Sequence, residues 1–441
     1  MRALIVGLSA ALAGCGANHS WRSLPPALPE VGVVASDVPI EVATLDDGRP
    51  AYLVRRSGDT AVVGLALRTG PGIDPALASF ALGLVARGRD HAVEDALGEL
   101  GGAAEVRWLV DGAVLRAEVD AAAWRPALTV LERALREPEF TAADLEELRA
   151  ERVAALQRRD GDPARVALHV LAGRVAPMHD PLGDDRSVET WTDGHVREVL
   201  SRLAGGSWAA IVVHADARLD AGARAAPSAV IARAAEAEAE VRGEIVVVPR
   251  PGLPQTAIAL GRVMPAVDAD ASLAIEVAGV AVASALRDVL RRDRGATYSV
   301  AVGYAPAASG GLLTIETQVE TGALGGSLRA IVDRLRELQA RFALGDQLSR
   351  VSRAIRVERV LACQRSETLA DLVAGSFAAG RSTGELQDVL RGRGEVRGDA
   401  VQRAVRAYFE PARLQIVLVG DPERIAAQVG GLGLGPIRVL R

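Results

Sequence analysis

The segment Leu290–Val300 has the sequence LRRDRGATYSV and links two stretches of different character. The preceding residues 271–286 are rich in alanine and have the spacing of apolar residues that is typical of a helix. The following run, Gly311–Val319, has the apolar character of a buried strand. We therefore expect a helix-to-strand segment over Arg287–Val300, followed by a further strand.

The same order of elements occurs earlier in the chain. An alanine-rich helical stretch covers residues 75–87, a helix-to-strand segment covers Glu94–Val106, and an apolar strand covers Ala113–Val119. Each copy is preceded by two strand-like runs. These runs are Tyr52–Arg55 and Ala61–Leu67 in the first copy, and Val246–Arg250 and Thr256–Leu260 in the second. Chance similarity between two unrelated α/β domains is the alternative, and the shared order of at least six elements disfavours it.

Both copies continue with two amphipathic helices and close on a strand that ends in aspartate. Leucines and isoleucine with helical spacing mark the helices, at Leu128, Leu131 and Leu135 and at Leu328, Ile331, Leu335 and Leu338. The closing strands are Ala210–Asp216 and Gln415–Asp421. The sequence thus predicts two homologous α/β domains, at residues 38–218 and 244–441, joined by an Ala-, Arg- and Glu-rich linker at 219–243.

Length and composition fit a globular protein of two or more domains. The chain has 441 residues, of which 49% are hydrophobic and 24% charged, so it can bury a sizeable core. The net charge of −5 and the absence of long runs of like charge argue against nucleic-acid binding. All basic residues are arginine, which excludes lysine as a general base or Schiff-base nucleophile.

The N-terminus has the features of a lipoprotein signal. Met1 and Arg2 precede an apolar run, Ala3–Ala13, that is too short for a stable membrane span. The run ends in Leu12-Ala13-Gly14-Cys15, which resembles a bacterial lipobox and implies a lipid on Cys15. A plain secretory signal that happens to contain cysteine is the alternative. Gly16, rather than aspartate, follows Cys15, which by resemblance favours the outer membrane. Residues 16–37 are predicted to be a tether, and Cys363 a small core residue.

The order of elements resembles the insulinase-like (pitrilysin) metallopeptidase family. Leu290–Val300 is similar to the family's Arg-Gly-x-x-Tyr-Ser signature. Phe140-Thr141, Leu100-Gly101-Gly102 and Val419-Gly420-Asp421 fit the family in the same order. The resemblance covers nearly all of the chain after residue 37. It implies an α+β fold in which two homologous tandem domains form one half of a clamshell around a chamber.

The zinc-binding motif of the resembled family is missing. Members carry His-x-x-Glu-His on a first-domain helix, where two histidines hold Zn²⁺ and the glutamate activates water. Alignment to the glycine that follows this motif, here Gly88, places Ser79 and Gly83 at the histidines and Leu82 at the glutamate. The third ligand aligns with Arg158, a cation that would repel Zn²⁺. No two of the six histidines are three to five residues apart, so we expect no metal and no catalytic residue in this chain.

Other catalytic signals are also missing. No serine lies in a Gly-x-Ser-x-Gly elbow, and the glycine-rich residues 430–435 are followed by no βαβ unit that would make them a phosphate loop. Arg294 and Tyr298 match the residues that, in the resembled family, contact the peptide near the scissile bond. An internal ion pair for Arg294 and sheet packing for Tyr298 are the alternative roles.

Three functional hypotheses follow. In the first, the chain positions peptide substrates through Arg294 and Tyr298 for a homologous zinc-bearing subunit, so that zinc is expected only in the partner. In the second, it is a pseudoenzyme that acts as a structural or peptide- or protein-binding scaffold at the cell envelope. The third, an autonomous hydrolase, has no nucleophile–base pair to support it. The lipobox resemblance places the chain on the periplasmic face of the outer membrane.

Overall fold

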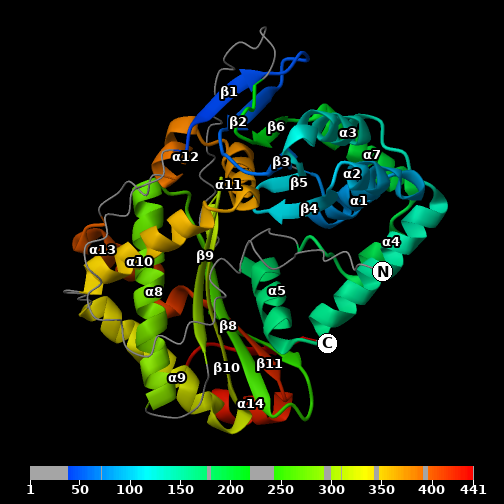
Figure 1. Ribbon diagram of the computed structural model, residues 1–441. Helices are drawn as coiled ribbons and strands as arrows, with labels where there is room; N and C mark the ends of the chain where they lie inside the picture. The colour runs from blue at the N-terminus through cyan, green and yellow to red at the C-terminus, as the bar shows by residue number, and fades with distance from the viewer. Residues whose placement is uncertain are drawn as a thin grey trace.

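A computed structural model describes residues 38–70, 72–175, 180–218, 243–292, 299–308, 310–341, 347–390 and 396–440. Two six-stranded sheets, each covered by helices, form two lobes (Figure 1). The first lobe is built mainly from residues before 218 and the second mainly from residues after 243. The fold is therefore mixed α and β in two tandem units, as the repeat predicts.

The first sheet has the strand order β1-β2-β6-β3-β5-β4. Its strands β2 and β6 are parallel, and all other neighbours are antiparallel. The strand bounds are Ile40–Thr44 (β1), Pro50–Val54 (β2), Thr60–Arg68 (β3), Ala103–Leu109 (β4), Gly112–Asp120 (β5) and Trp208–Val213 (β6). Both faces of the central strands are buried, which explains the nearly continuous apolar runs in β3 and β6.

The second sheet repeats this plan with the order β12-β7-β11-β8-β10-β9. β7 is parallel to β11 and to β12, and the remaining pairs are antiparallel. The bounds are Ile245–Pro249 (β7), Gln255–Met264 (β8), Val300–Ala307 (β9), Gly310–Glu320 (β10), Gln415–Gly420 (β11) and Ile437–Val439 (β12). Strands β4 and β9 therefore occupy equivalent edges of the two sheets.

Groups of helices separate groups of strands along the chain. Those before the linker are Pro75–Arg87 (α1), Ala92–Glu99 (α2), Trp124–Arg136 (α3), Ala142–Asp160 (α4), Pro163–Val175 (α5), Asp185–Thr190 (α6) and Asp193–Gly205 (α7). Those after it are Ala269–Arg292 (α8), Leu324–Ala340 (α9), Gln347–Ala362 (α10), Ser366–Ala378 (α11), Thr383–Leu390 (α12), Gly398–Tyr408 (α13) and Pro422–Val429 (α14). The single helix α8 takes the place of the pair α1 and α2, which Gly88 separates at φ 72°.

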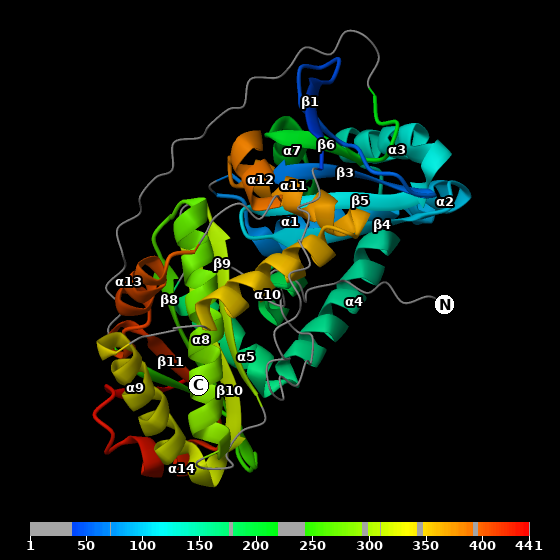
Figure 2. The ribbon, with the colours of Figure 1, turned by 60° about the vertical axis from the view of Figure 1, so that its left-hand side comes forward.

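The two lobes exchange one helix each. Helix α5 of the first half packs on the second sheet, where Leu171 contacts the cluster that contains Val246 and Val417. Helix α11 of the second half packs on the first sheet, where Val373 joins the cluster of Val62 and Ile211. In both views the orange helices α11 and α12 lie against the blue and cyan strands (Figures 1 and 2). Each sheet thus completes its core with a helix from the other half.

Polar contacts reinforce this exchange. The guanidinium of Arg68 on β3 donates to the carbonyl oxygens of Phe377 and Ala378 at the end of α11. Asp111, in the turn between β4 and β5, accepts a hydrogen bond from the backbone N–H of Ala308 in the turn between β9 and β10, at 2.9 and 3.0 Å to its two oxygens. The tips of the two edge hairpins therefore meet.

Several sequence expectations fall outside this description. The signal segment 1–15, the tether 16–37 and most of the linker 219–243 lie beyond the described residues, as do Arg294 and Tyr298. Cys363 lies in the core against the first sheet, 5% exposed. Within the described part of the chain, no helix is long and apolar enough to cross a membrane.

Candidate functional site

The residues at the expected zinc positions lie on α1, between the first sheet and α4. Helix α1 starts at the N-cap Asp74, whose side chain accepts from the N–H of Ala76, and Pro75 fits its first turn. Ser79 is 6% exposed and Leu82 is 0% exposed, and Leu82 belongs to the core of the first lobe. A carboxylate at position 82 would lose its water without gaining a partner there.

Gly83 is tightly covered by α4. A Cβ atom added at Gly83 would lie 3.0 Å from Cδ2 of Leu148. An imidazole at this position would have to displace the leucine, so the helix pair is packed as a core contact. The capping box at the start of α4, in which Thr141 and Asp144 bond each other's backbone, fixes the start of that helix.

The cation that faces Ser79 is Arg152 of α4. Its Nη2 donates to Oγ of Ser79 at 3.3 Å, and its Nη1 donates to the carbonyl oxygen of Pro181 at 2.6 Å. The guanidinium carbon lies 5.9 Å from the ring centre of Phe80. Arg152 is 5% exposed, and this burial lowers the pKa of its guanidinium to about 10, against the opposing effect of Asp180. It is therefore charged at neutral pH, where it would repel a metal cation.

Arg158, which the alignment places at the third ligand, lies elsewhere on α4. It is exposed and six residues beyond Arg152, so the structure puts Arg152 and not Arg158 opposite Ser79. A signal for Arg152 exists in the sequence. Together with Leu145, Leu148 and Leu156 it forms a stripe with steps of three to four residues, and this stripe is the buried face of α4. An arginine within an apolar stripe indicates a buried charge with a specific partner.

Residues 180–182, between α5 and α6, lie against this site, where the carbonyl oxygen of Pro181 accepts from Arg152. Asp180 accepts hydrogen bonds from Nδ1 of His169 at 2.9 Å, from Nη1 of Arg159 at 3.0 Å and from the N–H of Leu182 at 2.8 Å. Burial alone would raise the pKa of Asp180, but these bonds lower it below the ordinary value. Asp180 is therefore a carboxylate that fixes the loop carrying Pro181. Among the described residues, no group of three or more His, Cys, Asp or Glu side chains could hold a metal ion.

A second arginine joins α1 to α4 at the far end of α1. Arg87 is 3% exposed, pairs with Glu151, and has its Nη1 3.6 Å from Glu147. Together with Arg152, it ties α1 to the middle of α4 at two points. The arrangement stabilises a packed helix pair and provides no activated nucleophile or base.

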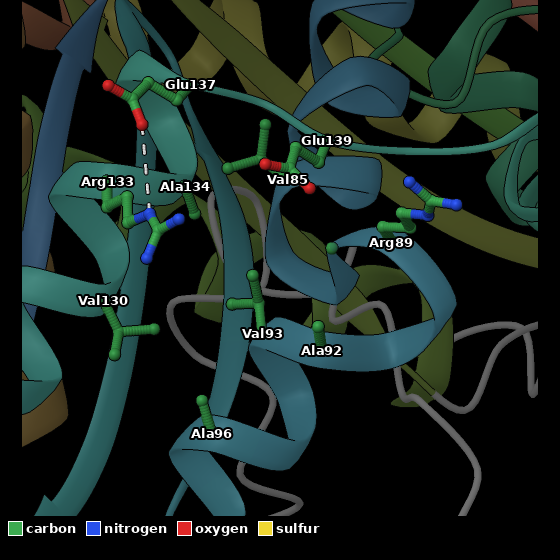
Figure 3. Close-up of a pocket in the computed structure, with 11 residues that line it drawn as sticks. Val85, Arg89, Ala92, Val93, Ala96, Val130, Arg133, Ala134, Glu137 and Glu139 are labelled. Atoms are coloured by element: carbon green, nitrogen blue, oxygen red, sulfur yellow. Dashed lines mark ion pairs between the residues drawn. The ribbon is translucent and has the colours of Figure 1, made fainter.

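A shallow pocket of about 230 Å³ opens beside the end of α1. Its apolar wall comes from α1, α2 and α3, and charged side chains form its rim (Figure 3). The lining residues are Val85, Gly88, Arg89, Ala92, Val93, Ala96, Val130, Arg133, Ala134, Glu137 and Glu139. On this rim Arg133 pairs loosely with Glu137, at 3.9 Å. The pocket therefore offers no nucleophile–base pair for catalysis.

Comparisons with known proteins find one matching family model and several solved structures with a similar fold. Residues 221–343 match the family model of the peptidase M16 inactive domain. The search of curated proteins finds no match. Three solved structures illustrate the fold similarity.

The peptidase M16 inactive domain from Pseudomonas fluorescens has a TM-score of 0.74 at 19% identity, over 87% of this chain and 98% of that one. A protease from Helicobacter pylori has a TM-score of 0.73 at 15% identity, over 87% and 99%. The periplasmic protease PqqL from Escherichia coli has a TM-score of 0.65 at 14% identity, and the match covers 87% of this chain but 46% of that one. In its fold the chain resembles these M16, or insulinase-like, peptidases, residues 221–343 match the inactive-domain model of that family, and the sequence contains no His-x-x-Glu-His motif.

Proposed function

We propose that the chain is a non-catalytic, substrate-positioning subunit of a periplasmic peptidase complex. A homologous subunit would carry zinc and hydrolyse the peptide bond, and this chain would hold the peptide in the chamber between them. The contact between Arg152 and Ser79 carries this proposal. A buried guanidinium occupies the face of α1 where the resembled enzymes bind zinc, so hydrolysis requires a second protein.

The length of the chain supports pairing. The match to the Escherichia coli periplasmic protease spans about half of that protein. A homologous partner of similar length would supply the other half of a chamber. Because α5 and α11 are exchanged between the sheets, the two lobes of this chain form one unit that a partner can face.

The free sheet edges support a role in holding peptides. β4 and β9 each have one hydrogen-bonded neighbour among the described strands, β5 and β10 respectively. Such an edge offers backbone N–H and C=O groups to an extended peptide. Arg294 and Tyr298 immediately precede β9 in the sequence. In this role, the guanidinium and the phenol would donate to a substrate carbonyl or to a terminal carboxylate.

The N-terminal sequence supports an envelope location. A lipid on Cys15 would anchor the chain at the periplasmic face of the outer membrane, with residues 16–37 as the tether. The partner would then work at the membrane surface or be recruited to it from the periplasm.

Co-purification and reconstitution test the proposal. The membrane-released protein should co-purify with a chain that contains His-x-x-Glu-His. Neither protein alone should hydrolyse a fluorogenic peptide, whereas the mixture should, and chelation of zinc should abolish the activity. Co-purification with an unrelated membrane protein, and no gain of activity with any zinc-bearing homologue, would favour the non-catalytic scaffold instead.

A further inference from the structure

The edge strand β9 presents small residues on the face that carries α5. Val302 and Tyr304 pack with the cluster on the α8 side of the sheet. The alternating residues Ala301 and Gly303 therefore point to the opposite face. Figure 1 shows α8 and α5 on opposite sides of this sheet. Because α5 packs chiefly on β8 and β11, the edge formed by β9 lies beyond the part of the sheet that it covers.

Glu316 of β10 lies beside this edge. It pairs in register with Ala301, and Thr314 pairs with Gly303. Leu313 and Ile315 belong to the cluster on the α8 side, so Glu316 projects to the α5 side with Ala301. A Cβ atom at Gly303 would lie 2.8 Å from Oγ1 of Thr314, so the absence of a side chain at Gly303 leaves space beside Thr314 on this face of the sheet.

Among the described residues, the carboxyl of Glu316 has one polar partner and no cation. Thr314 Oγ1 donates to its Oε1 at 3.0 Å. No described arginine or histidine forms an ion pair with it, and burial raises the pKa of Glu316, while the bond from Thr314 lowers it. Two other buried carboxylates do have cations. Asp180 pairs with His169, and Asp371 of α11 lies 3.1 Å from Arg107 of β4.

The free-energy cost of removing the Glu316 carboxylate from water is only partly offset in this position. Removing its charge from water costs free energy, and one hydroxyl donor offsets a fraction of that cost. An ammonium or guanidinium group from a ligand would offset most of the remainder through a charge-assisted hydrogen bond. An extended peptide paired with β9 would place every second side chain on the face of Ala301 and Gly303, one strand away from Glu316, where a cationic group can reach the carboxylate across these two small residues.

We propose that Glu316 forms a subsite for a cationic group of an extended peptide that pairs with the edge of β9. The cation is either a Lys or Arg side chain or the free amino terminus of the peptide. The inference rests on the proposed peptide-holding function, and it adds a preference for positively charged substrates that originates in this chain.

Binding of labelled ten-residue peptides to the full chain, measured by fluorescence anisotropy, tests this preference. The peptides differ only in one central residue, Lys, Ala or Glu, and each is made with a free and with an acetylated amino terminus. A cationic peptide should bind about tenfold more tightly than its neutral counterpart, as expected for one hydrogen bond to a charged group. The difference between the side-chain and terminal series identifies which cation is recognised.

Variants assign the preference to one side chain. Glu316→Gln should abolish it, whereas Glu320→Gln, at the exposed end of the same strand, should retain it. Glu316→Lys should reverse the preference in favour of the Glu peptide, and melting temperatures should verify that the variants fold. N-methylation of alternate peptide bonds should abolish binding, because it removes strand pairing.

Two results would overturn the inference. One is an unchanged charge preference in Glu316→Gln, and the other is failure of the folded chain to bind any of the peptides. Neither result decides the proposed function, because reconstitution with a zinc-bearing subunit measures hydrolysis independently of charge preference.

Discussion

Arg152 of α4 donates a hydrogen bond to Ser79 of α1, which joins the two helices on which the family resemblance predicts the degenerate zinc positions. The same guanidinium also holds the carbonyl of Pro181. The site is therefore filled by a side chain with its own partners. This replacement has consequences for stability and for metal binding that can be measured.

Arg152→Ala should destabilise the folded chain by about 2–4 kcal/mol. The change leaves a cavity beside Phe80 and removes the donor to the carbonyl of Pro181. Arg158→Ala, on the exposed side of the same helix, should change the free energy of unfolding by no more than about 0.5 kcal/mol. Urea unfolding monitored by circular dichroism gives both values. Equal effects of the two variants would show that Arg152 is not the residue that secures the helix pair.

The soluble part of the chain, residues 20–441, should bind no stoichiometric zinc. Ser79, Leu82 and Gly83 supply no imidazole or carboxylate, and the charge of Arg152 opposes a cation. Elemental analysis after incubation with zinc and dialysis measures this directly. One tightly held zinc ion per chain would contradict the assignment and would require ligands outside α1 and α4.

The repeat in the sequence predicted the central strands of both sheets, but it predicted two amphipathic helices in each half where the described residues contain five, α3–α7 and α9–α13. Apolar runs such as Ala61–Leu67 and Ala210–Val213 are buried on both faces, and continuous apolar character is the signal of such strands. The exchange of α5 and α11 could not be predicted in the same way. An amphipathic pattern shows that a helix buries one face, but it does not specify the sheet on which that face packs.

The site was predicted less completely than the fold. The alignment identified Ser79, Leu82 and Gly83 on α1, because the glycine after the motif fixes the register of a single helix. The third position is far along the chain on another helix, so the glycine after the motif does not fix its register, and its match to a zinc ligand stays a prediction. Counting residues thus pointed to Arg158, whereas the buried stripe of α4 contains Arg152.

Cys15→Ala should release the protein to the soluble fraction or leave the precursor uncut. The prediction is based on the sequence Leu12-Ala13-Gly14-Cys15 at the end of the apolar run, in which the thiol of Cys15 would carry the lipid. Membrane fractionation followed by immunoblotting measures the change. Cys363→Ser is the matched control, since this buried thiol lies in the core and should not affect anchoring. A Cys15→Ala protein that is processed and still sediments with membranes would refute the lipobox.

Asp47 should make the stability of the first lobe sensitive to acid. Burial alone would raise its pKa, but hydrogen bonds from Arg136 and Arg49 lower it to about 2. Both guanidinium groups also lie over the ring of Trp208, at 5.1 and 4.5 Å from its centre. The folded-state pKa lies below the unfolded value near 4, so the carboxylate contributes stability above about pH 4 and loses it as the pH falls towards 2.

The partial exposure of Asp47 limits this contribution to about 1 kcal/mol. Melting temperatures of the wild type and of Asp47→Asn should therefore differ at pH 6 and converge near pH 2. Asp46→Asn, in the same turn and exposed, should follow the wild type at every pH. A constant difference between the wild type and Asp47→Asn across this range would mean that the ion pairs do not depend on ionisation of Asp47.

Arg294 and Tyr298 should affect turnover by the reconstituted complex and have little effect on folding. If they donate to a substrate carbonyl or to a developing oxyanion, each contributes on the order of 2–4 kcal/mol to the transition state. Arg294→Ala or Tyr298→Phe should then reduce the peptidase rate roughly a hundredfold or more, with little change in melting temperature. An internal ion pair and a packed ring would give the opposite pattern, a loss of about 1–3 kcal/mol of stability with unchanged activity per folded molecule. Peptidase rates and melting temperatures measured side by side for each variant separate these roles, and the second pattern would make the non-catalytic scaffold the better account of this chain.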